Sequence, residues 1–454
     1  MGKLFGTDGI RGVVNAGLDA DLAYKVGLAA ATVLAKNKKE GEKPLVTIGK
    51  DTRISGDLLK GSLIAGLCTA GANVMDLGTL PTPGVAWVTV DTKADAGIVI
   101  SASHNPFEHN GIKIFNGQGF KLSDELEEKI EEIVLFGHND VPRKTHGEIG
   151  KVSYVAPKVS EDYIDHLAST IHSDLGGLHI LVDCANGAAS ATAARLFDRF
   201  DRLRTDVINA DPDGVNINEK CGSTHMDSLA AMVKAGGYDL GIAFDGDADR
   251  CLAVDETGSF IDGDQIMAAC GLDLKTRGAL SNNTIVATVM SNIGLHSFAR
   301  EHGLALECTN VGDRNVLECM LEKGYVLGGE QSGHMIFLNY ATTGDGELTA
   351  LQILDLLCRS GKRASELFGA CKRYPQELIN VAVDGNDAKQ RVMSAPWLKE
   401  AIAEKERTLN GEGRILIRPS GTEALVRVMV EAADDDTARS VAADLADLIK
   451  TKEN

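Results

Sequence analysis

The chain reads Ala-Gly-Ile-Val-Ile from residue 96 to residue 100 and continues as Ser-Ala-Ser-His-Asn-Pro to residue 106. The five apolar residues are typical of a short buried strand, and the polar residues with their closing proline are typical of a turn. Side chains that follow a buried strand are held by the sheet and open to a cleft, a common position for chemistry in α/β proteins. A plain turn capped by Ser and Asn explains the same residues, so this turn alone does not decide between a structural and a chemical role.

Outward from this turn, strands alternate with helices. Apolar runs predict strands at residues 45–48, 96–100, 179–182, 240–244 and 285–289. Helical spacing predicts one helix over residues 57–70 and another that begins at Ser123 or Asp124, and an alanine-rich helix is expected after residue 187. This alternation indicates βαβ units and a mainly parallel sheet.

The last part of the chain has a different pattern. Residues 414–417 and 424–430 are predicted strands joined by a loop, and a closing helix follows, which suggests a small α+β unit with an antiparallel element. A chain of 454 residues is too long for one hydrophobic core, so several domains are expected. The predicted domains are residues 1–150, 151–257, 258–370 and 371–454. The first three each place a polar, Gly-containing loop after an apolar strand, which suits three similar α/β units around one cleft.

Composition limits the partners of the chain. The net charge of -19 argues against a nucleic acid or an anionic membrane surface as partner, and an anionic substrate would need a local basic site. The nine cysteines are scattered without a CxxC pair, which fits a reducing compartment. No apolar run has membrane-spanning length, and the first five residues do not resemble a signal peptide. We therefore expect a cytoplasmic protein.

Three carboxylates alternate at Asp245, Asp247 and Asp249 and are followed by Arg250. This spacing lets three hard oxygens converge on Mg²⁺ or Ca²⁺. An EF-hand is rejected, because Arg250 stands where that loop needs glycine and the flanking residues are typical of strands. A solvated acidic turn is the alternative, but three like charges in one turn repel one another, so we predict a metal site. We expect the loop to face solvent, so that Asp247→Ala leaves folding nearly intact.

Two further loops have groups that suit ligands. The turn from Arg418 to Glu423 has two hydroxyls, backbone N–H groups and an arginine, which suit a phosphate, and Arg427 follows inside an apolar strand. The segment from Gly328 to His334 offers a carboxylate, an amide and a hydroxyl between glycines, which suit sugar hydroxyls or an amine. A plain turn and a glycine-rich connection are the alternative interpretations.

Together these four loops resemble the α-D-phosphohexomutase family, in order and spacing, along nearly the whole chain. The turn at residues 101–106 is similar to the family's phosphoserine loop, residues 245–250 to its metal loop, residues 328–334 to its sugar loop and residues 418–423 to its phosphate loop. The resemblance implies four domains in a heart shape around a deep cleft, three of them mixed α/β and the fourth an α+β cap.

The resemblance also implies roles, residue by residue. Ser103 would carry the transferable phosphate, and the three aspartates would bind one Mg²⁺ with an oxygen of that phosphate. Arg250 would stabilise the group in transfer, and Arg11 would add positive charge to the cleft. The acid and base candidates are Lys113, His104 and His334. The substrate-binding candidates are Glu330 and Ser332 at the sugar and Arg418, Ser420, Gly421, Thr422 and Arg427 at the phosphate that does not react.

Within the family, the opening at residues 5–12 and the Glu-Gln-Ser form of the sugar loop resemble those of members that act on an amino-sugar phosphate. They point to interconversion of glucosamine 6-phosphate and glucosamine 1-phosphate through a sugar 1,6-bisphosphate, which feeds amino-sugar nucleotide and cell-wall synthesis. The alternatives are mannose or glucose phosphates as substrates, a metal-dependent sugar phosphatase, and a catalytically silent sugar-phosphate binding protein. A homodimer is a further expectation. The residues themselves leave open which of Ser101 and Ser103 is phosphorylated.

Overall fold

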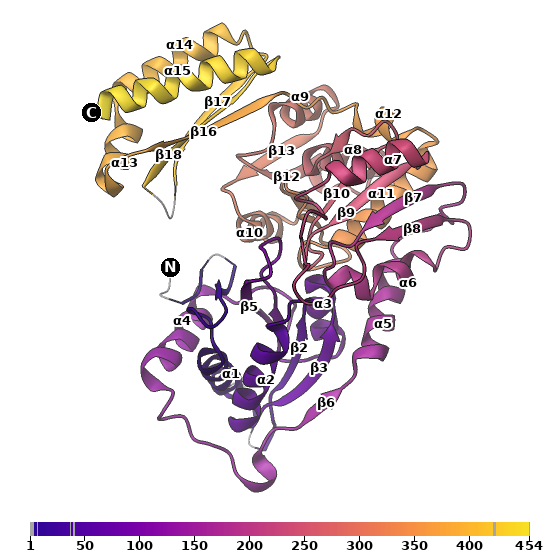
Figure 1. Ribbon diagram of the computed structural model, residues 1–454, viewed down its shortest axis with the longest axis vertical. Helices are drawn as coiled ribbons and strands as arrows, with labels where there is room; N and C mark the ends of the chain where they lie inside the picture. The colour runs from indigo at the N-terminus through magenta and orange to yellow at the C-terminus, as the bar shows by residue number, and fades with distance from the viewer. Residues whose placement is uncertain (1–3, 7, 37, 40, 421–423, 454) are drawn as a thin grey trace. The chain divides into compact units, whose positions relative to one another are not determined.

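The computed structural model describes residues 4–453 apart from residues 7, 37, 40 and 421–423. Two compact units divide the chain, one of residues 1–290 and 304–370 and the other of residues 291–303 and 371–454. Each unit is built on its own sheets, of which the first unit has three and the second has one (Figure 1). Among the described residues, no helix is both long enough and apolar enough to cross a membrane.

The first sheet has six strands in the order β1-β5-β4-β2-β3-β6. The strands are β1 (Ile10–Val13), β2 (Leu45–Lys50), β3 (Asn73–Thr79), β4 (Ala96–Ile100), β5 (His109–Asn116) and β6 (Val152–Tyr154). All five residues of β4 are buried, as the apolar run predicts, and the serine turn follows directly. β4 pairs in parallel with β2 and antiparallel with β5, so the sheet is mixed.

The same part of the chain contains helices α1 (Ala20–Ala35), α2 (Gly56–Thr69), α3 (Thr82–Asp91) and α4 (Asp124–Glu132). We call this part the first block, and the parts that contain the second and third sheets the second and third blocks. α1 and α2 lie side by side (Figure 1). A Cβ on Gly27 would lie 2.3 Å from the carbonyl oxygen of Leu63, and one on Gly66 would lie 2.1 Å from that of Tyr24. These two glycines therefore permit the close approach of the two helices. The predicted start at Asp124 is confirmed, and a π-helical turn over Ile133–Gly137 ends this segment.

The second sheet has the order β11-β10-β9-β7-β8. Its elements are β7 (His179–Asp183), α6 (Ala193–Phe197), β8 (Arg204–Ile208), α7 (Asp227–Gly236), β9 (Leu240–Phe244), β10 (Cys251–Asp255) and β11 (Phe260–Ile261), with α5 (Ala156–Ala168) before them. β9 and β10 are antiparallel, so the acidic loop at residues 245–250 connects two strands, as its flanks predict.

The alanine-rich segment after residue 187 is not the single helix that we expect from its composition. It forms a 3₁₀ turn over Ala188–Ala191 and then the five-residue helix α6. Thr192 separates them with φ -127° and ψ -42°, and its hydroxyl donates to Glu347 Oε1 at 2.7 Å. A tertiary hydrogen bond thus interrupts a sequence whose local preference is helical.

The third sheet has the order β13-β12-β14-β15. Its elements are α8 (Gly263–Thr276), β12 (Thr284–Thr288), β13 (Ala305–Thr309), α10 (Asp313–Lys323), β14 (Leu327–Gly329), β15 (Met335–Phe337), α11 (Gly346–Ser360) and α12 (Ala364–Phe368). β12 pairs in parallel with β13 and β14, and β15 is antiparallel to β14. All three sheets therefore have parallel pairs, as predicted, together with antiparallel strands that the alternation of elements did not indicate.

The second unit is the predicted α+β element. Its antiparallel sheet has the order β16-β18-β17. The elements are α9 (Ile293–Glu301), β16 (Gln376–Ala382), α13 (Gly385–Ser394), α14 (Pro396–Thr408), β17 (Arg414–Pro419), β18 (Leu425–Glu431) and α15 (Asp435–Glu453). Val426, Val428 and Val430 of β18 share a buried cluster with Leu445 and Ile449 of α15, so the closing helix covers one face of this sheet.

Candidate active site

The serine turn directs one hydroxyl at the acidic loop. Ser103 is buried, and its Oγ donates to Asp245 Oδ2 at 2.6 Å. Its backbone has φ +52°, in the left-handed region that non-glycine residues rarely adopt. Ser101 is also buried, but its Oγ accepts the N–H of Ser103 at 2.9 Å and so supports the turn. The geometry thus favours Ser103 over Ser101 as the reacting serine.

The three aspartates converge. Asp245, Asp247 and Asp249 are all buried, and one carboxylate oxygen of each lies within 4.8 Å of the others. The expectation that this loop faces solvent is therefore wrong. Among the described residues, Asp247 Oδ1 and Asp249 Oδ1 have no hydrogen-bond partner. Burial and the charges of Asp249 and Asp247 raise the pKa of Asp245 well above its ordinary value. Such oxygens fit a hard divalent cation, Mg²⁺ or Ca²⁺.

Three backbone contacts hold the acidic loop in place. The N–H of Ala188 donates to Gly246 O at 2.8 Å, that of Thr82 to Asp247 O at 2.9 Å and that of Gly346 to Ala248 O at 2.9 Å. The donors come from the second, first and third sheets' blocks respectively, so all three blocks support the loop. Ala248, between Asp247 and Asp249, has φ +55°, in the left-handed region that non-glycine residues rarely adopt.

Lys113 on β5 pairs with two aspartates of the triad and with Asp8. Its Nζ is 3.0 Å from Asp247 Oδ2, 3.1 Å from Asp8 Oδ2 and 3.7 Å from Asp249 Oδ2. Burial by itself would lower the pKa of Lys113, but these carboxylates raise it above its ordinary value. Lys113 is therefore an ammonium, suited to stabilising a phosphate or giving a proton.

His104 and Arg250 connect the serine to the acidic loop. His104 Nδ1 lies 3.4 Å from Ser103 Oγ and 3.2 Å from a terminal nitrogen of Arg250. Burial and the charge of Arg250 lower the pKa of His104, which favours the neutral ring of a base. The backbone N–H of Arg250 donates to Asp245 Oδ1 at 3.2 Å, which fixes the start of its side chain.

His334 lies between two carboxylates. Its Nδ1 is 3.7 Å from Asp249 Oδ2, and its Nε2 is 3.7 Å from Asp313 Oδ2. Burial would lower the pKa of His334, but Asp249 and Asp313 raise it to about 9. When the ring is neutral, Nε2 accepts the N–H of Gly344 at 3.1 Å and the proton lies on Nδ1. In either form, Nδ1 carries a proton toward Asp249.

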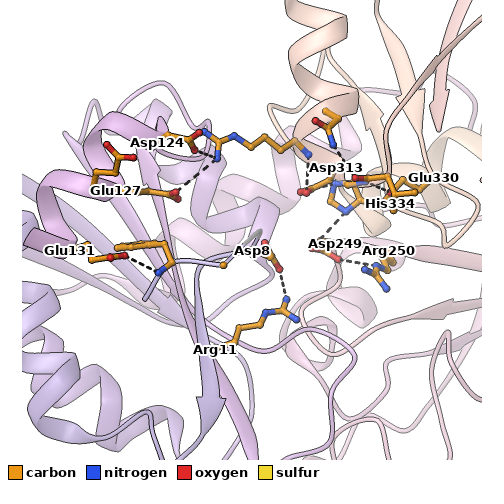
Figure 2. Close-up of a pocket in the computed structure, with 17 residues that line it drawn as sticks. Asp8, Arg11, Asp124, Glu127, Glu131, Asp249, Arg250, Asp313, Glu330 and His334 are labelled. Atoms are coloured by element: carbon orange, nitrogen blue, oxygen red, sulfur yellow. Dashed lines mark hydrogen bonds and ion pairs between the residues drawn. The ribbon is translucent and has the colours of Figure 1, made fainter. Parts of the chain in front are cut away.

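A cavity of about 570 Å³ opens beside these groups. Figure 2 shows Asp249, Arg250, Asp313, Glu330 and His334 gathered on one side of it. Asp8, Arg11 and acidic side chains of α4 line the other side. The predicted residues that line it are Arg11, Asp249, Arg250, Glu330 and His334. Ser332 is exposed and does not line this cavity.

Some residues of this site carry weak signals in the sequence or none. Asp8 lies in the glycine-dense opening, which draws attention to it, and Asp313 lies in a polar stretch after β13. Lys121 gives no such signal, yet its Nζ is 2.7 Å from Asp8 and 2.7 Å from Asp313. Thr82 donates to Asp247 Oδ2 at 2.7 Å, and no sequence motif indicates this role either. These contacts join segments far apart in the chain, which is why spacing does not reveal them.

The predicted phosphate loop belongs to the second unit. Arg418 on β17 and Arg427 on β18 are partners in register. Burial and the charge of Arg427 lower the pKa of Arg418. Ser420 is buried, and its carbonyl accepts from Lys389 Nζ at 2.8 Å. Gly421 and Thr422 lie outside the described residues. Two adjacent guanidinium groups suit an anion such as phosphate.

Segments that cover most of the chain match the domains of one known protein family. Residues 2–139, 161–258, 262–374 and 378–448 match the phosphoglucomutase/phosphomannomutase family, as its alpha/beta/alpha domains I, II and III and its C-terminal domain. Phosphoglucosamine mutase of Ruminiclostridium cellulolyticum is 53% identical over 453 residues, 99% of each chain. That of Acetivibrio thermocellus is 53% identical over 455 residues, 100% of each chain.

Solved structures show the same fold. A phosphoglucomutase/phosphomannomutase family protein of Burkholderia thailandensis has a TM-score of 0.80 at 24% identity, covering 99% of this chain and 98% of the other. N-acetylphosphoglucosamine mutase of Aspergillus fumigatus, solved with GlcNAc-6P and magnesium, has a TM-score of 0.69 at 20% identity, covering 99% and 96%.

Proposed function

The chain belongs to the phosphoglucomutase/phosphomannomutase family, and we propose that it is an enzyme that interconverts glucosamine 6-phosphate and glucosamine 1-phosphate. The substrate is inferred from full-length relatives at about half identity, which carry the name phosphoglucosamine mutase. The observation that carries the proposal is the 2.6 Å contact of Ser103 Oγ with Asp245, beside Arg250 and His104. A nucleophilic hydroxyl beside a candidate cation site supports phosphoryl transfer as the reaction.

We infer the following use of the residues. With Ser103 phosphorylated, the C1 hydroxyl of glucosamine 6-phosphate attacks the phosphorus, and the bond from phosphorus to Ser103 Oγ breaks. His104, as a neutral ring, would accept the proton of the C1 hydroxyl, and Lys113, as an ammonium, would give a proton to the departing Ser103 Oγ or stabilise its charge. Magnesium held by the three aspartates would neutralise charge on the transferring group.

The second half-reaction uses the same groups in reverse. The sugar 1,6-bisphosphate reorients within the site, Ser103 Oγ attacks the phosphorus of the 6-phosphate, the bond from that phosphorus to O6 breaks, and glucosamine 1-phosphate leaves. Arg250 and Arg11 supply positive charge at the cavity. The carboxylates of Glu330 and Asp313, which line the same cavity, suit the hydroxyls and the ammonium group of the sugar.

One assay series tests this function. The purified protein is given Mg²⁺, a trace of sugar 1,6-bisphosphate and glucosamine 6-phosphate, and the products are followed by ³¹P NMR. We expect glucosamine 1-phosphate, with a higher kcat/KM than for mannose or glucose phosphates. An equal or higher kcat/KM for those sugars would reject the proposed substrate. Release of inorganic phosphate as the main product would indicate a phosphatase, and no turnover would indicate a binding protein.

Further features accompany this proposal. Three features stay predictions: the domain boundaries after residues 150, 257 and 370, the homodimer, and the cytoplasmic location. Size-exclusion chromatography with light scattering tests the homodimer, because the mass of the particle in solution distinguishes one chain from two.

A further inference from the structure

An arginine outside the four loops is fully buried beneath the serine turn. Arg53 is 0% exposed and forms an ion pair with Asp51, which is also buried. Taking both charges out of water is costly, and apolar residues would fill the same space at lower cost. The guanidinium therefore calls for an explanation beyond packing.

The contacts of Arg53 supply that explanation. One terminal nitrogen donates to the carbonyl oxygen of Ser103 at 3.0 Å and to that of Asn105 at 2.6 Å. From the second block, Asn218 Nδ2 donates to the same two oxygens, at 2.9 Å and 3.0 Å. Two side chains from different parts of the chain thus converge on two carbonyl groups of the serine turn.

These carbonyl groups belong to the strained part of the turn. Ser103 has φ +52°, a conformation that costs an ordinary residue energy and persists only when its surroundings impose it. Its N–H donates to Ser101 Oγ, and its C=O accepts from Arg53 and Asn218. Side chains therefore hold both polar groups of the Ser103 backbone, and this backbone aims Oγ at Asp245.

The packing leaves little room for another arrangement. A Cβ on Gly246 would lie 2.5 Å from the carbonyl oxygen of Ser103 and 2.9 Å from Asn218 Nδ2. The acidic loop and the serine turn are therefore in direct backbone contact where Asn218 bonds. A shift of the turn would move Ser103 Oγ relative to all three aspartates.

We propose that Arg53 and Asn218 are positioning residues, which hold Ser103 in its left-handed conformation and so align its hydroxyl with the acidic triad. This inference rests on the proposed function, since it concerns the serine that carries the phosphate. Both side chains donate to carbonyl oxygens of the serine turn, so they act on the reaction through the backbone of Ser103. Asp51 has the supporting role of balancing the charge of Arg53.

The test compares two variants with a matched control. Asn218→Gly removes both hydrogen bonds and tolerates the φ of +59° at this position, where alanine would be strained. Arg53→Lys keeps a charge for Asp51 but lacks the planar fork in which one terminal nitrogen pairs with Asp51 while the other donates to the two carbonyl groups. The control is Thr52→Val, because Thr52 Oγ1 donates to Asn186 O at 2.6 Å, from the same segment to the same second block, without a contact to the serine turn.

Two readouts are measured for each protein. In steady-state kinetics with glucosamine 6-phosphate, we expect kcat to fall by about tenfold or more in Asn218→Gly and Arg53→Lys, with KM within about twofold, because misalignment affects the reacting atoms and not substrate binding. In hydrogen exchange, we expect faster exchange across residues 101–106 in both variants. Thr52→Val should match the wild type in both readouts, and melting temperatures show that each protein is folded.

The possible outcomes test the positioning role separately from the proposed mutase function. Wild-type kcat and wild-type exchange in Asn218→Gly would overturn the positioning role, even if Arg53→Lys does not fold. A raised KM with unchanged kcat would also overturn it, because it would place these residues in substrate binding. If the wild type shows no mutase turnover, the proposed function fails, and hydrogen exchange still decides whether Arg53 and Asn218 hold the turn.

Discussion

At the scale of single residues, the two serines of the turn have different partners. Ser103 Oγ faces Asp245, whereas Ser101 Oγ accepts the N–H of Ser103. We expect Ser103→Ala to lose both the phosphorylated mass and the mutase activity. Ser101→Ala should keep the phosphate and turn over more slowly, because it removes only a support of the turn. Intact-mass spectrometry with peptide mapping checks both, and loss of the phosphate in Ser101→Ala alone would reverse the assignment.

The aspartate at the centre of the acidic loop has two structural partners besides its place in the triad. Asp247 Oδ2 accepts from Thr82 and is paired with Lys113, and Oδ1 is the atom available to a cation. Asp247→Asn should therefore abolish Mg²⁺-dependent turnover and also lower the melting temperature, because Lys113 loses a buried counter-charge. Mg²⁺ should raise the melting temperature of the wild type but not of this variant. Asp201→Asn, an exposed carboxylate of the same block, serves as the control. Full activity in Asp247→Asn would remove the metal assignment.

At the scale of elements, the turn before α11 supports both His334 and the acidic loop. A Cβ on Gly344 would lie 2.4 Å from His334 Nε2, the atom to which the Gly344 N–H donates. Gly344→Ala should displace the ring and lower kcat by about tenfold or more, a size typical for a misplaced acid or base. The control is Gly61→Ala on α2, where a Cβ meets nothing within 4 Å and should stabilise the helix slightly. Equal kinetics of the two variants would show that the ring tolerates the shift.

The first turn of α11 also makes stability depend on pH. Glu347 is fully buried, its Oε1 accepts from Thr192, and burial raises its pKa from 4.5 to about 8. Because the pKa of Glu347 is higher in the folded protein, its full contribution to the free energy of unfolding is present below pH 4.5. That contribution falls by on the order of 4 kcal/mol as the pH rises toward 8. Glu347→Gln should therefore melt at a higher temperature than the wild type at pH 8 and near the same temperature at pH 5. Glu404→Gln on the exposed side of α14 is the control, and parallel melting curves for all three proteins would contradict the assignment.

The sequence predicts the elements that have strong local signals. β4 has the bounds that its apolar run indicates, and the strands on both sides of the acidic loop are where their residues indicate. It predicts poorly where a distant contact decides the structure. The alanine-rich segment breaks at Thr192 because of a bond to Glu347, and the burial of Asp247 depends on Thr82 and Lys113 from the first block. Likewise, motif spacing finds Ser103 and the triad but not the donors that hold the turn, since those donors lie in unremarkable sequence.

At the scale of the whole molecule, turnover should depend on the second unit as well as the first. Arg418 and Arg427 are adjacent cations whose mutual repulsion a phosphate would relieve. A charge-assisted contact is worth about 1.5–3 kcal/mol, so Arg418→Ala should lower kcat/KM by roughly tenfold to a hundredfold. It should also release sugar bisphosphate into solution, because the intermediate must stay held while it turns. Phosphorylation of Ser103 and Mg²⁺ binding should survive. Kinetics with chromatography for free bisphosphate checks this, and unchanged kinetics without release would leave the loop a plain turn.

The bonds between the serine turn and the acidic loop have a consequence for motion. Ser103 to Asp245, Thr82 to Asp247 and Asn218 to the turn all cross from one α/β block to the next. A hinge along this seam would break them at the moment when phosphoryl transfer needs them. Under the proposed mechanism, the two blocks therefore pass through the whole cycle as one rigid body. The half-turn of the bisphosphate is then a rotation of the ligand past a stationary centre, which presents the C1 end and the C6 end of the sugar in succession to the same serine.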